Sequence, residues 1–332
     1  MNFSSLGIRM EITLTEIYKP IQEQIERVAE GVRQVWEDTL KLVDIDTSMA
    51  PKAKGKLLRP AICLLSAGII GKKDLNVYIP LSTSFELLHL ASLTHDDVID
   101  RAIIRRGGQS LNSLWNNHAA VLGGDYLVAR ATELLGRYES HELILNSVQC
   151  VREMAEGELK FFTKSINNFT IDNCRELARK KTAMLFACSA STPALLENLP
   201  ERDNLFRFGE SIGIVFQFID DLLDLTQDSN ILGKPRYSDI IEQKVTLPIL
   251  LLWEQMETDE KDFFNSIFGK PLTEKEQKWI EEKLERYKIK KSTIQYAEEL
   301  KLLAIKELDK FPNSDFKKSL TNLCHFIVQR QN

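Results

Sequence analysis

Apolar residues recur every three or four positions along most of this chain. The spacing is clear in residues 14–43 and 117–138, and it continues through residues 174–196 and 206–227. Such a period places the apolar side chains on one face of an α-helix. Residues 79–100, IPLSTSFELLHLASLTHDDVID, are instead apolar on all sides until they become acidic at the end. We expect this segment to be a central helix that other helices surround.

The segments after Trp253 differ, because charged residues follow one side of each helix expected in residues 273–308. This pattern predicts outer helices with a solvated face. No stretch alternates between apolar and polar residues as a half-buried strand does. The sequence therefore predicts an all-α fold of about ten or more helices, in one domain spanning residues 1–332 with its core at roughly 20–330. We expect breaks between helices at residues 51–60, 105–110, 164–172, 197–203 and 228–244.

The composition agrees with a helical globular protein. Of the 332 residues, 43% are hydrophobic and 27% are charged. There are only 15 glycines and 10 prolines, which disfavours a loop-rich or all-β fold. The net charge of −5 gives no global reason to expect a nucleic-acid partner.

The cysteines and the N-terminal residues predict a cytoplasmic protein. The cysteines are odd in number and form no CxxC pair, which is typical of buried reduced thiols. The N-terminal residues lack a basic segment followed by an apolar one, so we expect no signal peptide, and Met10 is an alternative start to Met1. No apolar stretch approaches the roughly 18 residues that span a membrane.

Two acidic motifs, HDDVID and QFIDDLLD, follow apolar helical segments. Asp96 and Asp100 are four residues apart and share one helix face, as do Asp220 and Asp224. Like charges at this spacing repel unless a cation neutralises them. Mg²⁺ is commonly held by one or two carboxylates together with waters and substrate phosphates. Solvated acidic helix ends remain an alternative for either motif alone. The recurrence of the pattern favours two walls of a Mg²⁺ site around a diphosphate.

Basic residues accompany these motifs at positions where glycine or proline also occurs. Arginine recognises phosphate oxygens in pairs, and lysine supplies a point charge. Each cation alone would be an ordinary surface residue, but their repeated association with glycine, proline or an acidic motif favours phosphate binding. They are Lys56 and Arg59 before Pro60, Arg105 and Arg106, Lys180 and Lys181, and Lys234, Arg236 and Lys244.

With these motifs the chain resembles the trans-isoprenyl (polyprenyl) diphosphate synthases over roughly residues 20–330. The resemblance is carried by DDVIDRAIIRRG, FQFIDDLLD, GKLLRP, GDYL, the Lys181–Thr182 pair, Gly233–Lys234 and KVTLP. It implies an all-α fold around a central cavity and a Mg²⁺-dependent, head-to-tail condensation of isopentenyl diphosphate with an allylic diphosphate. It also implies three Mg²⁺ ions in each active site and a homodimer.

The resemblance further implies a role for each matching residue. Asp96 and Asp100 would bind Mg²⁺ from one wall and Asp220 from the other, with Asp97, Asp221 and Asp224 as secondary candidates. Thr182 and Gln217 would direct oxygen dipoles at the developing carbocation, and Lys244 would close the site. The allylic diphosphate would be bound by Arg105, Lys181, Thr182, Gln217, Lys234 and Lys244, and isopentenyl diphosphate by Lys56, Arg59, His89 and Arg106. For His89, a core histidine is the alternative.

The chain departs from the family at two positions. The family usually has a glycine where Tyr237 stands and another where Gln243 stands. Both positions lie in a segment that resembles a lid, so they leave its conformation open. They are also compatible with a partner subunit that helps to close the site.

The chemistry implied needs no nucleophilic side chain. Mg²⁺, lysine and arginine would stabilise the charge of the leaving diphosphate. The double bond of isopentenyl diphosphate would then attack the allylic cation, and a proton would be lost to the released diphosphate. We find no serine, cysteine or histidine constellation for covalent catalysis in the sequence.

The helix before Asp96 predicts the product length. Ser92, Leu88 and Phe85 lie near the same face as Asp96, with Ala91 beside them. Ser92 would lie about 6 Å below Asp96 and Phe85 about 16 Å below it. Small residues at the first positions leave room for a growing chain, although ordinary helix packing also uses alanine and serine. We expect a product of about C30–C50, such as a quinone side chain, from an enzyme with transient membrane contact but no membrane anchor.

Three alternatives remain at this point. A short-chain farnesyl or geranylgeranyl diphosphate synthase would result if Phe85 or a residue of another helix formed a high floor. A class I terpene cyclase would need neither GKLLRP nor Arg106, and its second motif would differ from DDLLD. A subunit of a heteromeric prenyl synthase is the third, although a regulatory subunit usually lacks aspartates that both motifs retain here.

Overall fold

The computed structural model describes residues 12–42, 55–100, 102, 104–105, 108–161, 165–227 and 236–330. The helices, in chain order, are α1 (Leu14–Tyr18), α2 (Gln22–Lys41), α3 (Leu58–Ile69), α4 (Ile79–Ile99), α5 (Leu111–Leu114), α6 (Asn117–Gly136), α7 (His141–Phe161), α8 (Ile171–Ala178), α9 (Met184–Leu196), α10 (Arg202–Thr226), α12 (Ser238–Ile241), α13 (Leu247–Gln255), α14 (Thr258–Ile267), α15 (Glu274–Arg286), α16 (Ile289–Glu307) and α17 (Asp315–Gln329). Short 3₁₀ turns lie at Lys19–Ile21, Leu75–Tyr78, Ile166–Asn168 and Leu308–Lys310.

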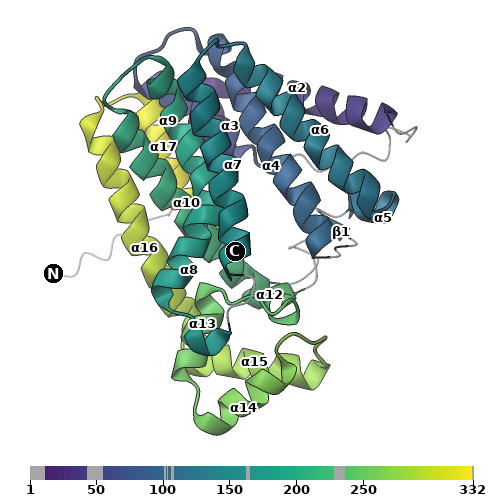
Figure 1. Cartoon of the computed structure of the whole chain (residues 1–332). Helices are drawn as coiled ribbons and strands as arrows, with labels where there is room; N and C mark the ends of the chain where they lie inside the picture. Colours follow the sequence, from purple (N-terminus) through teal and green to yellow (C-terminus); the bar gives the residue numbers. More distant parts are fainter. Residues whose placement is uncertain are drawn as a thin grey trace, which may run out of the picture.

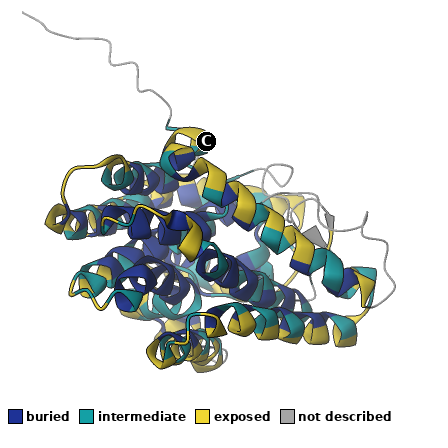
Figure 2. Cartoon of the chain, turned by 90° about the horizontal axis from the view of Figure 1, so that it is seen from above, coloured by how far each residue is buried: buried dark blue, intermediate teal, exposed yellow. Residues whose placement is uncertain are grey.

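The helices form a bundle around a few central members (Figure 1). α4 packs along α6, and α10 packs against α9 and α16. α9 also contacts α3, α4 and α7, so it links the two helices that carry the acidic motifs. Figure 2 shows the buried residues gathered in the middle of the bundle and the exposed ones on the outer sides of the peripheral helices. The prediction of an all-α fold is confirmed.

The central helices are apolar on nearly all sides. Every residue of α9 from Met184 to Leu195 is buried, and so is every residue of α3. α4 is buried from Leu81 to Leu88 and becomes partly exposed toward its acidic end. The five cysteines are buried free thiols. Within the described residues, no helix has the length and apolar character to cross a bilayer.

The structure differs from the sequence prediction in two details, a break within one expected helix and a short β-hairpin. The apolar period across residues 14–43 predicts one helix, but the chain divides into α1, a 3₁₀ turn and α2 at Pro20. Proline lacks a backbone N–H and cannot continue the hydrogen-bond ladder, which explains the interruption. A small antiparallel hairpin also follows α4, with β1 (Ile104–Arg105) paired to β2 (Gly108–Gln109). Strands of two residues are too short for an alternating pattern to show in the sequence.

The segment after α13 packs through a carboxylate on α14. Glu260 accepts hydrogen bonds from Lys283 Nζ at 2.5 Å, Tyr287 Oη at 2.6 Å and Arg286 Nη1 at 3.4 Å. The bond from Lys283, followed by that from Tyr287, lowers the pKa of Glu260 from 4.5 to about 2. Because the folded-state pKa is depressed, the stabilising contribution is complete above pH 4.5 and is lost as the pH falls toward 2.

We therefore expect Glu260→Gln to flatten the acid dependence of stability. Between pH 4.5 and 2, the free energy of unfolding of the unmodified chain should fall more steeply than that of the variant. Urea unfolding at a series of pH values measures both slopes. Glu282→Gln, on the exposed side of α15, is the matched control. Identical slopes for all three proteins would contradict the assignment.

Candidate active site

The first acidic motif forms the C-terminal end of α4. Asp100 caps the helix, and its N–H donates to Asp96 O at 2.8 Å. Its carboxylate accepts a hydrogen bond from Lys244 Nζ at 2.8 Å, a contact between residues 144 positions apart. Lys244 also pairs with Glu242 at 2.7 Å. The lysine of KVTLP is therefore held at the first acidic motif, and its closing role stays a prediction.

Asp97 differs from its two neighbours in the motif. It is 4% exposed, whereas Asp96 and Asp100 are partly exposed. Its backbone carbonyl accepts a hydrogen bond from Asn112 Nδ2 at 3.1 Å. The prediction that Asp97 points away from the face shared by Asp96 and Asp100 agrees with this burial.

Asp96 faces the lysine of the KT pair. Burial raises the pKa of Asp96, and the carboxylates of Glu158 and Asp100 add to the rise, while Lys181 and Lys244 oppose it. Burial alone would lower the pKa of Lys181, but Asp96 and Glu158 outweigh that effect and raise it. Lys181 also forms an ion pair with Glu158. The ammonium of this partly exposed lysine therefore interacts with carboxylates of both α4 and α7.

Lys181 and Thr182 lie in a π-helical turn, Arg179–Ala183, between α8 and α9. The sequence predicts one uninterrupted helix here, so the π turn is a correction. Such turns carry an extra residue and often occur at functional sites. The neighbouring Lys180 forms ion pairs with two carboxylates of α7, with Nζ 3.2 Å from Glu153 and 3.0 Å from Glu156. At this turn the consecutive residues Lys180 and Lys181 therefore contact different carboxylates.

Two glycines let neighbouring helices approach this turn. A Cβ added at Gly157 would meet Lys180 Cβ at 2.7 Å, and one at Gly213 would meet Ala183 Cα at 2.5 Å. Only glycine permits this closeness without displacing a neighbour. α7 and α10 can therefore both lie directly against the residues that carry Lys181 and Thr182.

The second acidic motif is joined to the π turn by a chain of hydrogen bonds. Thr182 Oγ1 donates to Gln217 Oε1 at 2.5 Å, and Gln217 Nε2 donates to Asp221 Oδ1 at 2.6 Å. Asp221 is 8% exposed, whereas the side chain of Asp220 is 49% exposed. Asp220 is therefore the more accessible of the paired carboxylates. Gln217 and Asp221 fix the position of Thr182.

Asp224 does not share the environment of Asp220. It is fully buried, and its carboxylate accepts hydrogen bonds from Ser238 Oγ and from Asp239 N at 3.1 Å. The two carboxylates of this pair therefore differ in accessibility, because α12 and the residue before it fold over Asp224. This carboxylate anchors the segment that leads to Lys244.

Tyr237 and Gln243 both have left-handed backbones, with φ of 64° and 60°. Non-glycine residues pay about 1–2 kcal/mol for this conformation. A glycine would adopt this conformation without that cost. Tyr237 is held by Glu281, whose Oε1 lies 3.2 Å from the hydroxyl, and by the guanidinium of Arg236, 4.5 Å from the ring centre. The chain therefore keeps the glycine-type backbone with larger side chains.

The residues predicted to bind isopentenyl diphosphate begin at the N-terminus of α3. Lys56 is exposed, and its carbonyl accepts a hydrogen bond from Tyr18 Oη at 2.5 Å. Arg59 is 7% exposed, with its guanidinium 4.7 Å from the centre of the Phe186 ring. His89 is partly exposed on α4, which does not fit a core histidine.

Three predicted cations cannot be placed. Arg106 and Lys234 lie outside the described residues, and Arg105 is described only by its backbone in β1. Two site residues are absent from the sequence prediction, namely Glu158 and Arg330. Arg330 Nη2 lies 3.9 Å from Asp220 Oδ1. Neither residue belongs to a motif, and only the packing of α7 and α17 brings them here.

The residues proposed to set product length lie along α4. Phe85, Leu88 and Ala91 are 0%, 5% and 1% exposed. Ser92 is partly exposed, and its hydroxyl donates to the His89 carbonyl at 2.8 Å. These four side chains therefore follow one another from the core toward Asp96.

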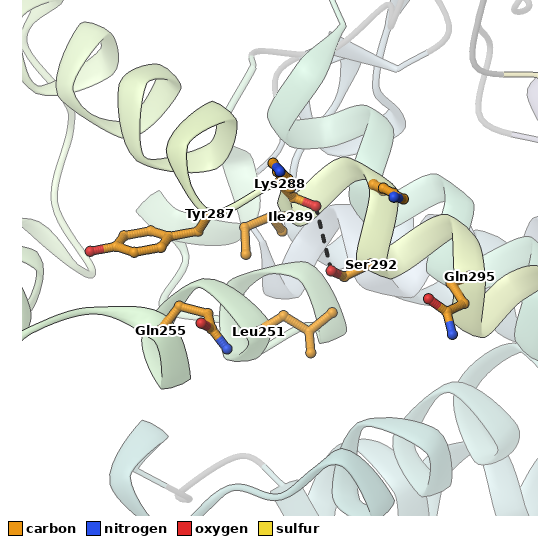
Figure 3. A pocket seen from close by; sticks show the side chains of 8 residues that line it. Leu251, Gln255, Tyr287, Lys288, Ile289, Ser292 and Gln295 are labelled. Carbon is orange, nitrogen blue, oxygen red and sulfur yellow. Dashed lines mark hydrogen bonds between the residues drawn. The ribbon is translucent and has the colours of Figure 1, made fainter.

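A cavity in another part of the structure is lined by none of the predicted site residues. It has a volume of ≈ 330 Å³ and lies where α13, α15 and α16 meet. Figure 3 shows Tyr287, Lys288, Ser292 and Gln295 around it, with Leu251 on its floor. Its lining contains none of the residues of the two acidic motifs.

Comparison with known proteins shows relatives that match most of the chain. A family model described as polyprenyl synthetase matches residues 46–285. An all-trans-nonaprenyl-diphosphate synthase (geranyl-diphosphate specific) of Rhodobacter capsulatus is 31% identical over 317 residues, covering 95% of this chain and 97% of that protein. A geranylgeranyl diphosphate synthase of Saccharolobus solfataricus is 32% identical over 84% of this chain and 87% of that protein. Heptaprenyl diphosphate synthase component 2 of Geobacillus stearothermophilus is 34% identical over 71% and 72%.

The fold has solved counterparts as well. The crystal structure of a polyprenyl synthase from Caulobacter crescentus, complexed with calcium and isoprenyl diphosphate, superposes with a TM-score of 0.88. It is 27% identical and covers 98% of this chain and 100% of that chain. The family match and this fold together place the chain in the class of prenyltransferases. The chain belongs to the polyprenyl synthetase family, and it is a trans-prenyl chain-elongating enzyme.

Proposed function

We propose that this enzyme condenses isopentenyl diphosphate with an allylic diphosphate, head to tail, to make an all-trans polyprenyl diphosphate of about C30–C50. The observation that carries the proposal is the set of cations that other segments bring to the first acidic motif, together with the contact of Arg330 with Asp220 of the second. Lys181 faces Asp96, and Lys244 pairs with Asp100. This alternation of carboxylates and cations suits a Mg²⁺–diphosphate complex, because each charge of the complex meets its opposite.

Mg²⁺ fits the available donors. Among the described residues, no group of three or more His, Cys, Asp or Glu side chains could hold a metal by itself. Mg²⁺ is commonly held by one or two carboxylates and substrate phosphates, so Asp96 and Asp100 would bind it from α4 and Asp220 from α10. Bound Mg²⁺ supplies Lewis-acid stabilisation of the leaving diphosphate. Three ions in each site remain a prediction.

The side chains of this chain supply the other requirements. Lys181 and Lys244 bind the allylic diphosphate and stabilise its charge as the C–O bond breaks. Thr182 donates a hydrogen bond to Gln217, which donates to Asp221, and the two fixed side chains direct oxygen dipoles at the carbocation. The double bond of isopentenyl diphosphate forms the new C–C bond, and the proton released goes to the diphosphate. Arg59 and Lys56 hold this second substrate.

Product length follows from the small residues below Asp96. Ala91 and Ser92 leave α4 narrow where a growing chain would pass, and Phe85 lies deeper. Several relatives bear long-chain names, which supports the range of about C30–C50, but the geranylgeranyl diphosphate synthase supports the shorter alternative. The number of isoprene units is therefore a proposal that product analysis must decide.

Replacing Ala91 with tyrosine is expected to shorten the product by several isoprene units. The phenol would fill the space one turn below the acidic end of α4 and stop elongation. Reversed-phase chromatography of the dephosphorylated products measures the length. Val77→Tyr, at an exposed position just before α4, should leave it unchanged. If folded Ala91→Tyr protein made a product of unchanged length, the proposal that these side chains of α4 set product length would be refuted.

One incubation tests the function itself. Purified chain is mixed with farnesyl diphosphate, labelled isopentenyl diphosphate and Mg²⁺, and the labelled product is sized. A labelled product of about C30–C50 supports the proposal. A labelled product that stops at C20 would favour the short-chain alternative. No incorporation by the chain alone would favour a subunit of a heteromeric synthase, an assembly suggested by the component 2 relative.

Other expectations stay predictions. They are a single domain over the whole chain, a homodimer, a cytoplasmic location, and transient membrane contact during release of the apolar product. Size-exclusion chromatography with light scattering would measure the oligomeric state directly.

A further inference from the structure

Four side chains from different helices form a continuous stack beside the predicted isopentenyl diphosphate site. The guanidinium of Arg59 on α3 lies 4.7 Å from the ring centre of Phe186 on α9. The Phe186 ring lies 5.3 Å from that of Phe216 on α10, tilted by 40°. The guanidinium of Arg330, which caps α17, lies 4.1 Å from the Phe216 ring centre. We call Arg59, Phe186, Phe216 and Arg330 the arginine–phenylalanine column.

The column is buried along most of its length. Phe186 is 0% exposed, Arg59 is 7% exposed and the side chain of Arg330 is 6% exposed. Burying a guanidinium is unfavourable unless its charge is compensated. An aromatic face compensates part of that charge, and more effectively when water is excluded. Each phenylalanine therefore stabilises one arginine in a fixed orientation.

The two ends of the column lie at different parts of the site. Arg59 belongs to the predicted isopentenyl diphosphate site. Arg330 Nη2 lies 3.9 Å from Asp220 Oδ1 and donates to the Phe216 carbonyl at 3.5 Å. The buried Nε of Arg330 has no hydrogen-bond partner among the described residues. Stacking on Phe216 and the contact with Asp220 are therefore the main interactions that place this guanidinium.

We propose that Phe186 and Phe216 are positioning residues for the condensation: they hold Arg59 for isopentenyl diphosphate and Arg330 against Asp220. One aromatic pair then positions both the arginine of the second substrate's site and the arginine at the accessible carboxylate of the second wall. The proposal rests on the proposed function, because it assigns Arg59 to isopentenyl diphosphate and Asp220 to Mg²⁺.

The test compares Phe186→Leu, Phe216→Leu and Phe216→Tyr with Phe264→Leu. Phe264 is also fully buried, and it packs against Trp253 and Phe268, away from the acidic motifs. Isothermal titration with isopentenyl diphosphate in Mg²⁺ gives its Kd without turnover. Steady-state assays give KM for each substrate and the Mg²⁺ concentration for half-maximal rate. Thermal unfolding monitored by circular dichroism reports on folding.

We expect Phe186→Leu to weaken isopentenyl diphosphate binding by about fivefold or more, with KM for the allylic substrate within twofold. Phe216→Leu should also raise the Mg²⁺ requirement, and Phe216→Tyr should restore it, because the ring is retained. Phe264→Leu should lower the thermal midpoint alone. Arg330→Lys keeps the charge but loses the planar stack, so it should raise the Mg²⁺ requirement even if a phenylalanine variant does not fold.

Two results would overturn the proposal. One is a Phe186→Leu protein whose affinity for isopentenyl diphosphate changes no more than that of Phe264→Leu. The other is an unchanged Mg²⁺ requirement in both Phe216→Leu and Arg330→Lys. If the unmodified chain neither binds nor incorporates isopentenyl diphosphate, the proposed function fails instead. The two failures are therefore distinguishable.

Discussion

Replacing Asp96 with alanine is expected to lower kcat by about a thousandfold or more, because the change removes a metal-binding carboxylate from the first wall. It also leaves Lys181 facing only Glu158, so that the cation is drawn away from the substrate. Steady-state assays at saturating concentrations of both diphosphates and a range of Mg²⁺ concentrations measure the loss. Excess Mg²⁺ should not restore the rate.

Asp97→Asn is the matched control for this prediction. Asp97 is buried and does not share the face of Asp96, so its replacement should lower the free energy of unfolding rather than the turnover of folded protein. We expect kcat of the folded fraction to stay within about tenfold of the unmodified enzyme. Equal losses of kcat in Asp96→Ala and Asp97→Asn would contradict the division of roles within the motif.

Replacing Lys181 with methionine is expected to lower kcat/KM for the allylic diphosphate by about a hundredfold to a thousandfold. Methionine keeps much of the side-chain length but removes the cation that faces Asp96. The pKa of Asp96 should rise further, because Lys181 is the main group that opposes the effect of burial. The acidic limb of the pH–rate profile should therefore move to higher pH.

Lys180→Met is the matched control for Lys181→Met. Lys180 pairs with Glu153 and Glu156 on α7, so we expect its loss to change kcat/KM by no more than about threefold. Varying each substrate in turn separates the effects, since KM for isopentenyl diphosphate should stay nearly constant in Lys181→Met. Similar losses in both variants would show that the π turn does not distinguish the two lysines.

Much of the site could be predicted because its residues belong to short local motifs. The spacing of Asp96 and Asp100 on α4 needs only helix geometry, and the resemblance identifies Lys244 from KVTLP. Asp224 could not be assigned in this way, because its partners Ser238 and Asp239 lie 14 and 15 residues further along the chain. A helical period gives the direction of a side chain but not what folds over it.

Other features depend on packing between distant segments. Arg330 reaches Asp220 because α17 lies against α10, and no local pattern near the C-terminus indicates it. The left-handed backbone at Tyr237 is indicated in the sequence only by the absence of the glycine expected there. The sequence could show that the position was unusual, but it could not show that Glu281 and Arg236 support a left-handed tyrosine.

The π turn at Arg179–Ala183 has a consequence for how insertions and deletions act on this enzyme. One residue rotates an α-helix by about 100°, and a π turn absorbs one extra residue without shifting the helices on either side. Deleting a single residue here would let α8 and α9 fuse into one regular helix while both stayed packed. Lys181 and Thr182 could then no longer face Glu158 and Gln217 together. The active site therefore depends on the length of a helix as well as on its side chains, and a one-residue deletion would disable it while leaving nearly every catalytic group in the chain.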